Sequence, residues 1–202
     1  MATEKTPKRE VTRGRVIKAA IDSIYRDGFN AAHTNRIAEE AGVSWGVLQY
    51  HFGDKDGLLQ AVLDHIFEGF IASLSQAKLE GSDTHERVKQ LIDAIWPLFS
   101  KKEYRVSIAI LRNAGKDESS KINGQNQVKA WAATMSRLWD ELLPEGIAGT
   151  KQSETARHLL FAGLRGLADD INPRARLTKS SWQDEREALG DAIANLLTSK
   201  HQ

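Results

Sequence analysis

Residues Thr34 to Lys55 read TNRIAEEAGVSWGVLQYHFGDK, and this stretch decides the fold of the first quarter of the chain. A polar start opens a short helix in which small Ala38 suits a close crossing of two helices. Gly42 suits a turn, because glycine adopts a positive φ without strain. Ser44 then stands where a second helix would need an N-cap. The order of these parts predicts a helix-turn-helix unit.

The second helix of this unit, residues 45–52, has two faces of different chemistry. If apolar Leu48 and Phe52 face the core, Trp45 and Gln49 must face outward. A glutamine amide can bind adenine N6 and N7 together, and an aromatic edge can meet a thymine methyl. We therefore expect the outward face to read a DNA major groove. The predicted DNA contacts on this face and at the helix ends are Thr34, Ser44, Trp45, Gly46, Gln49, Tyr50, His51 and Lys55.

Apolar residues recur at three- and four-residue spacing through most of the chain, which predicts an all-α fold of about nine helices. Thr34 and Asp54 are expected to cap the second and fourth of these helices. Pro97 should kink or end the helix that contains it. The expected helices cover about residues 12–27, 34–40, 45–52, 55–80, 85–100, 103–114, 121–143, 153–171 and 179–200, with breaks at Pro144 and Asn172-Pro173.

The amino-terminal 20 residues form a basic arm. They contain six basic residues against only Glu4 and Glu10. Such an arm can follow DNA phosphates without sequence preference, although a solvated tail is the plainer interpretation of a charged terminus. Its position next to the helix-turn-helix favours the DNA contact. The basic residues are Lys5, Lys8, Arg9, Arg13, Arg15 and Lys18.

Composition excludes several classes of function. The 202 residues contain no cysteine, which rules out disulfides and thiolate metal sites and suits a reducing cytoplasm. No apolar run approaches the roughly 20 residues that span a bilayer, and the polar amino terminus does not resemble a secretory signal. Metalloprotease, nucleophile-elbow and phosphate-loop motifs are absent from the sequence. We therefore expect a cytoplasmic protein that is not an enzyme, has no metal and no cofactor, and does not enter a membrane.

The spacing T-x-x-I-A-x-x-A-G-V-S-x-G-x-L-x-Y-H-F-x-x-K-x-x-L-L, from Thr34 to Leu59, resembles the DNA-binding unit of the tetracycline-repressor (TetR) family of bacterial regulators. With the upstream run A-A-I-x-x-I-Y-R-D-G-F, the resemblance covers about Arg15 to Leu63. It implies a sequence-specific, homodimeric transcriptional regulator, most simply a repressor that leaves a palindromic operator when a small molecule binds. Many members of that family have Tyr where this chain has Gln49, so the operator preference does not carry over.

The resemblance also implies a division into residues 1–54, the helix-turn-helix domain with its basic arm, and residues 55–202, a ligand-binding and dimerisation domain. In the family, the last two long helices form a four-helix bundle with the partner subunit. Apolar stripes with interleaved glycines suit such an interface, but each stripe also suits an intramolecular core. The predicted interface residues are Leu159, Gly163, Gly166, Leu167, Leu189, Ile193 and Leu196.

An aromatic-rich set on the middle helices is the candidate pocket for a small hydrophobic or aromatic effector. Each of these residues, taken singly, is more readily explained as plain core than as the wall of a ligand pocket. The set comprises Phe67, Phe70, Trp96, Phe99, Tyr104, Ile110, Asn113, Trp131, Met135, Trp139, His158 and Phe161. Two alternatives therefore stay open: a DNA-binding protein without an effector or controlled by a protein partner, and a helical enzyme or lipid carrier that retains a DNA-binding module.

Overall fold

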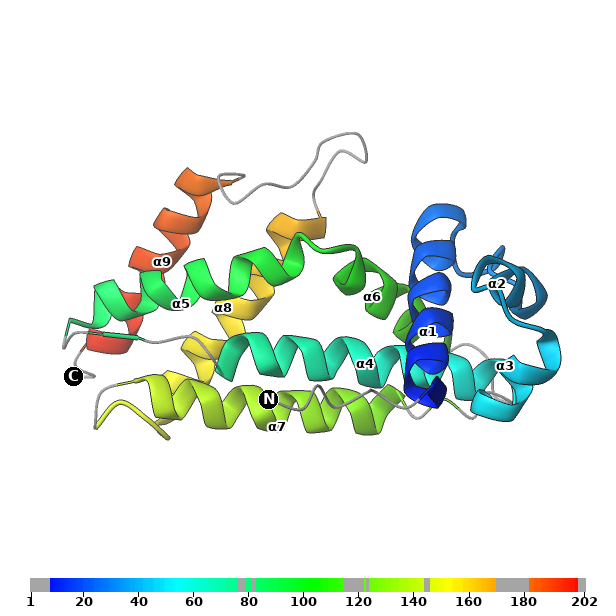
Figure 1. Cartoon of the computed structure of the whole chain (residues 1–202). Coiled ribbons are helices and arrows are strands. Elements are labelled where there is room, and N and C mark those ends of the chain that lie inside the picture. The colour runs from blue at the N-terminus through cyan, green and yellow to red at the C-terminus, as the bar shows by residue number, and fades with distance from the viewer. Residues whose placement is uncertain are drawn as a thin grey trace, which may run out of the picture. The chain divides into compact units, whose positions relative to one another are not determined.

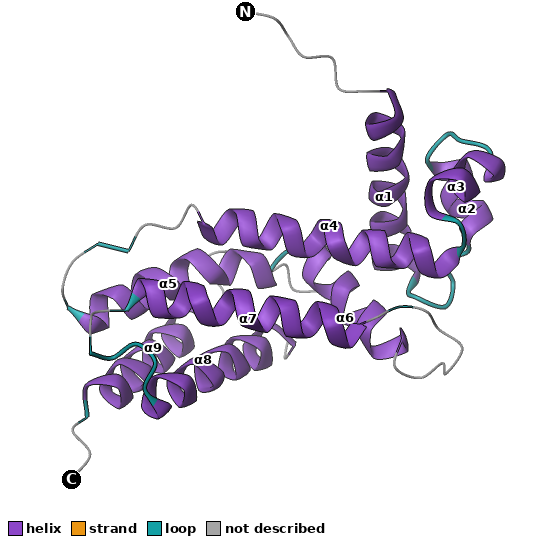
Figure 2. Cartoon of the chain, turned by 90° about the horizontal axis from the view of Figure 1, so that it is seen from below, coloured by secondary structure: helices purple, strands orange, loops and turns teal. Residues whose placement is uncertain are grey.

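The computed structural model describes residues 8–75, 79–80, 83–114, 122, 124–143, 146–169 and 182–199. Within these residues every regular element is a helix, and none is a strand (Figure 2). The all-α prediction is therefore confirmed for the described part of the chain. The predicted arm residue Lys5 and the predicted breaks at Pro144 and Asn172-Pro173 lie outside the described residues.

The helices follow the predicted order closely (Figure 1). α1 begins four residues before the expected Thr12, because its first turn is polar and has no apolar periodicity to reveal it. Pro97 lies inside α5, two residues before that helix ends. The bounds are α1 (Lys8–Asp27), α2 (Thr34–Glu40), α3 (Trp45–Phe52), α4 (Lys55–Ser75), α5 (Thr84–Phe99), α6 (Lys102–Ala114), α7 (Gly124–Leu142), α8 (Lys151–Asp169) and α9 (Gln183–Thr198).

The chain forms two compact units, each assembled from two stretches of sequence. The first comprises residues 1–69 and 102–128, and the second comprises residues 70–101 and 129–202. The division falls within α4, whose residues 55–69 belong to the first unit and whose remainder belongs to the second. The predicted boundary between residues 54 and 55 remains a prediction.

In the first unit, α1 packs on α2 and α6, and α2 packs on α3. The apolar stripe of α1 forms the centre of this core. Ile17, Ile21 and Ile24 are at most 3% exposed, and Ile37 of α2 is 2% exposed. Each fully buried side chain of this size contributes about 1.5–3 kcal/mol relative to an exposed one. Three-helix packing around α1 therefore holds the helix-turn-helix in place.

In the second unit, α5, α8 and α9 pack on one another. Leu160 and Leu164 of α8 are fully buried, as is Trp96 of α5. A Cβ atom at Gly163 would lie 2.8 Å from the Cδ2 atom of Leu189, so a glycine at this position lets α8 and α9 approach closely. The predicted role of Gly163 in a dimer interface stays a prediction.

One described helix, α4, is long and apolar enough to cross a membrane by length and composition alone. Charged Asp64 and Glu68 interrupt its apolar residues, so the sequence shows no unbroken apolar run of this length. Half of the most apolar window is buried inside the protein. A core helix passes the same test, so the finding is weak evidence for a membrane span.

Candidate nucleic-acid interface

The turn between α2 and α3 is built from local sequence signals. Gly42 has φ +64°, and its N–H donates to the carbonyl of Glu39 at 3.0 Å. The N–H of Val43 donates to the carbonyl of Ala38, also at 3.0 Å. These two bonds make the Schellman motif that commonly ends a helix before glycine. Only Ser44 then separates the turn from α3, so the directions of the two helices are fixed by a few residues.

Capping bonds also define both ends of α3 as the sequence predicted. The Oγ atom of Ser44 accepts from the N–H of Val47 at 3.3 Å. Gly53, with φ +78°, ends the helix, and Asp54 then caps α4 by accepting from the N–H of Gly57 at 2.8 Å. The prediction for α2 was wrong in one detail, because His33 rather than Thr34 is its N-cap residue. Thr34 is already helical, and His33 has the extended backbone of a cap.

The orientation of α3 agrees with the prediction. Leu48 is 1% exposed and joins the core. Trp45 is 51% exposed and Tyr50 is 73% exposed, and Gln49 lies on the same exposed surface. Phe52 is half-buried. An indole, an amide and a phenol are therefore presented outward by a helix whose aliphatic side is held by its own unit.

The other predicted DNA contacts lie around this face. Gly46 and Lys55 are exposed, whereas Thr34 and His51 are half-buried. The Nζ atom of Lys55 lies 5.1 Å from the ring centre of Phe29, which holds this cation at the start of α4. An open hollow of about 750 Å³ runs between α2 and α3. The residues that line it are Thr34, Asn35, Ala38, Glu39, Val43, Ser44 and Trp45.

The sequence analysis missed four residues at this surface. Asn35 and Glu39 face the hollow from α2, and their four-residue spacing on one helix could have revealed them. Arg9 and Arg13 were assigned only to a general basic arm. In the structure each lies over an aromatic ring at the end of α3. No sequence pattern predicts that contact, because some 40 residues separate the partners.

An ion-pair network joins the far end of α1 to α2. Arg26 binds Asp27 at 2.8 Å and Glu40 at 2.6 Å, and Arg36 binds the same two carboxylates at 3.2 and 3.1 Å. The hydrogen bond from Arg26 lowers the pKa of Asp27 below its ordinary value. These groups are exposed, so each pair contributes little alone. The network neutralises the cations at this end of the unit.

A second ion pair joins α1 to α6. The Nζ atom of Lys102 donates to the carboxylate of Asp22. This hydrogen bond raises the pKa of Lys102. The contact links the helix-turn-helix unit to a helix 80 residues away along the chain. It helps to keep α1 and α6 in one compact unit.

The predicted effector-pocket residues divide between the two units. Phe67, Tyr104, Ile110 and Asn113 belong to the first unit, and the other predicted pocket residues belong to the second. Asn113 donates its amide to the carbonyl of Ala109 in its own helix at 2.7 Å. The predicted pocket residues therefore do not all belong to one unit.

Within the second unit, most of the aromatic set is core. Trp96, Phe99, Met135 and Trp139 are buried, and the Nε1–H of Trp139 donates to the Oγ atom of Ser153 at 2.7 Å. The rings of Phe70 and Trp131 meet edge to face, with centroids 5.9 Å apart. Phe161 is half-buried and His158 is exposed. Whether any of them touches an effector remains a prediction.

The predicted dimer residues differ in exposure within one protomer. Leu159 is 51% exposed and Gly166 is exposed, with no atom within 4 Å of a Cβ placed there. Gly163, Leu167, Leu189 and Leu196 are half-buried, whereas Ile193 is 2% exposed and belongs to the core of its own unit. Leu159 and Gly166 of α8 are thus the two predicted interface residues that are exposed in the protomer.

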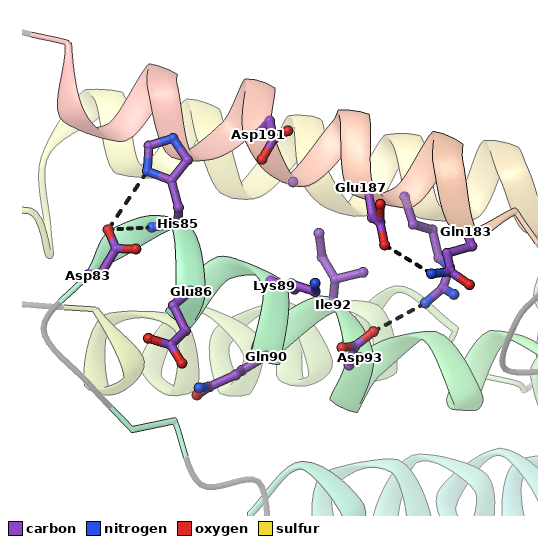
Figure 3. A pocket seen from close by; sticks show the side chains of 12 residues that line it. Asp83, His85, Glu86, Lys89, Gln90, Ile92, Asp93, Gln183, Glu187 and Asp191 are labelled. Atoms are coloured by element: carbon purple, nitrogen blue, oxygen red, sulfur yellow. Dashed lines mark hydrogen bonds and ion pairs between the residues drawn. The ribbon is translucent and has the colours of Figure 1, made fainter.

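A polar groove of about 900 Å³ lies between α5 and α9 (Figure 3). Asp83, Glu86, Lys89 and Asp191 are among its lining residues. Arg186 is only 6% exposed; it binds Asp93 at 3.4 Å and lies 5.1 Å from the ring centre of Trp96. The described residues contain no group of three or more side chains that could hold a metal ion. In the same groove, the Nε2 amide of Gln183 donates to the carboxylate of Glu187 at 3.0 Å.

Comparison with known proteins identifies the amino-terminal part. Residues 16–62 match the family described as bacterial regulatory proteins, tetR family. The HTH-type transcriptional repressor NicS of Pseudomonas putida is 27% identical over 117 residues, which are 56% of this chain and 55% of NicS. The chain spans about half the length of the curated relatives it matches.

Solved structures resemble almost the whole chain. A transcriptional regulator from Rhodococcus sp. Rha1 has a TM-score of 0.65 at 23% identity and covers 92% of this chain and 93% of its own. The superantigen PfiT has a TM-score of 0.70 at 23% identity and covers 96% of this chain and 100% of its own. At this identity the likeness concerns the fold alone. A protein described as a transcriptional regulator and one described as a superantigen share this fold, so function must be argued from the site.

Proposed function

We propose that the chain, whose residues 16–62 match the family of bacterial regulatory proteins, tetR family, is a transcriptional regulator that binds duplex DNA with α3 in the major groove. One observation carries the proposal. Leu48 is buried at 1% exposure, while Trp45 and Gln49 of the same helix are exposed to solvent. We propose no catalytic role for the protein. Its proposed location is the bacterial cytoplasm.

The residues of α3 and its flanks take different roles in the proposed complex. Gln49 reads an adenine edge, and Trp45 supplies apolar contact to a thymine methyl. Thr34 and Lys55, at the starts of α2 and α4, bind phosphates and so set the register of the protein on DNA. Ser44, Gly46 and His51 complete the surface; the lack of a side chain at Gly46 lets the backbone approach the duplex.

We propose that two copies bind a palindromic operator, since a single short recognition helix reads too few bases for a specific site. Support for a dimer surface comes from α8, where Leu159 is 51% exposed beside exposed Gly166. Gly163, Leu167, Leu189 and Leu196 would complete the interface. Ile193, which is 2% exposed, would support it from within the protomer.

We further propose that the protein represses transcription and releases DNA when a small hydrophobic or aromatic effector binds. α4 would transmit the effect, because its residues belong to both compact units. A coupling of about 1–3 kcal/mol is typical of such switches. Effector binding that leaves the DNA affinity unchanged would contradict this part of the proposal.

A second candidate function is control without an effector, or by a protein partner. It is favoured by the tight burial of the aromatic set in the second unit. Trp96 is 0% exposed, and Trp139 is 2% exposed and donates its N–H within the protein. Side chains with these contacts behave as core, and core residues need no ligand. A screen of small aromatic and aliphatic compounds for release of bound DNA separates the two candidates.

The experiment that tests DNA recognition is a selection of bound fragments from random duplexes with the full-length protein. The wild-type protein is expected to enrich a palindrome over competitor DNA. Gln49→Ala should cost about 1–3 kcal/mol on the selected site and relax the preference at one base pair. Lys55→Ala should weaken selected and random duplexes alike and reduce the salt slope by about one unit. Equal losses from Gln49→Ala on both duplexes would exclude base reading by Gln49.

A further inference from the structure

The amino-terminal end of α1 lies against the last turn of α3, on the side of the unit that carries Gln49. The Cζ atom of Arg9 is 5.8 Å from the ring centre of Tyr50. The Cζ atom of Arg13 is 5.7 Å from the ring centre of Phe52. Figure 1 shows the dark blue end of α1 beside α3. Two cations from one helix thus meet two rings from another.

Neither Arg9 nor Arg13 forms a salt bridge with another described residue, whereas Arg26 at the other end of α1 binds two carboxylates. Positive charges near a helix amino terminus oppose the helix dipole, and like charges four residues apart repel. Glu10 in the first turn of α1 offsets part of this charge, but the repulsion between Arg9 and Arg13 remains. Such local conflicts are expected where a surface serves a partner.

Stacking leaves an arginine able to bind phosphate. A ring meets the flat face of the guanidinium, while its five N–H donors point outward in the plane. Tyr50 is 73% exposed, so the contact between Arg9 and its ring lies on the outer surface of the unit. The ring of His51 meets that of Tyr50 edge to face at 5.3 Å, which restricts the phenol from its other side. The Tyr50 ring thus restricts the long side chain of Arg9, which would otherwise lose more conformational entropy on binding a phosphate.

We propose that Arg9, with Arg13 beside it, binds backbone phosphates next to the groove that α3 enters, and that Tyr50 is a positioning residue that holds Arg9 for this contact. The inference rests on the proposed function. In this proposal Tyr50 acts through its ring, which holds Arg9. A Tyr50 that bound phosphate directly would instead act through its hydroxyl. The DNA interface then extends from the helix-turn-helix onto α1.

The test is a double-mutant cycle on a random-sequence duplex and on a fragment selected by the wild-type protein. Tyr50→Phe, which keeps the ring, should leave the affinity unchanged. Tyr50→Ala should weaken binding about two- to fivefold more when Arg9 is present than in the Arg9→Ala background, as expected for a cation–π contact. Arg9→Ala should also reduce the slope of log affinity against log salt by about one unit. Tyr50 is so exposed that these variants should fold.

Two further variants make the cycle specific. Arg15→Ala removes an exposed cation of α1 that has no ring contact among those described. Tyr50→Ala should therefore weaken DNA binding by the same factor with and without Arg15. Arg9→Lys keeps the charge, so the salt slope should stay while part of the coupling is lost. Equal coupling of Tyr50 to Arg9 and Arg15, or a loss of affinity in Tyr50→Phe as large as in Tyr50→Ala, would overturn the inference.

The outcome also separates this inference from the proposed function. Wild-type protein that binds duplex DNA but shows no Arg9–Tyr50 coupling would refute only the positioning role. Wild-type protein that binds neither duplex would refute both.

Discussion

Ser23 in α1 offers a test of how the core of the first unit is built. Its side chain is 0% exposed, and its Oγ atom has no hydrogen-bond partner among the described residues. Leaving a buried polar group unsatisfied costs about 1–3 kcal/mol. Alanine fits the same space and is a better helix former by a few tenths of a kcal/mol. We therefore expect Ser23→Ala to raise the free energy of unfolding by about 1–3 kcal/mol.

Ser107 in α6 is a matched control in the same unit. It is 3% exposed, but its Oγ atom donates to the carbonyl of Tyr104 at 2.8 Å. Ser107→Ala loses this bond, which is worth about 0.5–1.5 kcal/mol, and makes the same gain in helix propensity. Its net effect should therefore be close to zero or destabilising. The two variants change the same atoms and differ in whether the hydroxyl has a partner.

The assay is urea unfolding followed by circular dichroism, with all proteins at one protomer concentration because dimerisation would shift apparent stability. With a slope of about 1–3 kcal/mol per molar urea, Ser23→Ala should move the midpoint up by about 1 M at an unchanged slope. Binding to a random duplex should not change. A midpoint that falls in Ser23→Ala by at least as much as in Ser107→Ala would refute the reasoning, since it would mean that the Ser23 hydroxyl is satisfied in the folded protein.

Three other predictions concern stability. Leu48→Ala should lower the free energy of unfolding by about 2–5 kcal/mol, whereas exposed Gln49→Ala should change it by less than about 0.5 kcal/mol; similar losses in urea would contradict the assigned orientation of α3. Trp139→Phe should destabilise by about 1–3 kcal/mol by leaving the Ser153 hydroxyl without its partner, and adding Ser153→Ala should recover part of that loss. The lowered pKa of Asp27 means that its stabilisation is present above pH about 4 and is lost as pH falls further, so midpoints measured across that range should fall less in Asp27→Asn than in wild type.

Local patterns were sufficient for the helix-turn-helix. The apolar spacing around Leu48 fixed which side of α3 is buried, because a helix with one apolar face has only one favourable orientation on a core. Gly42 predicted the turn, because few other residues adopt its φ of +64° without strain. The predicted start of the first helix at Thr12 was wrong, because α1 begins at Lys8. The polar first turn of α1 lacks the periodicity on which the prediction depended.

By itself, the sequence determined the helical class, the order of the helices and the outward face of α3, since all three follow from spacing within a few turns. Only the tertiary structure decided that Arg9 lies over the ring of Tyr50, that Ser23 is buried without a partner among the described residues and that Lys102 reaches Asp22. These contacts join residues far apart in the chain or depend on what surrounds a helix on every side. Periodicity says which face of a helix is buried, but packing decides which atoms that face meets.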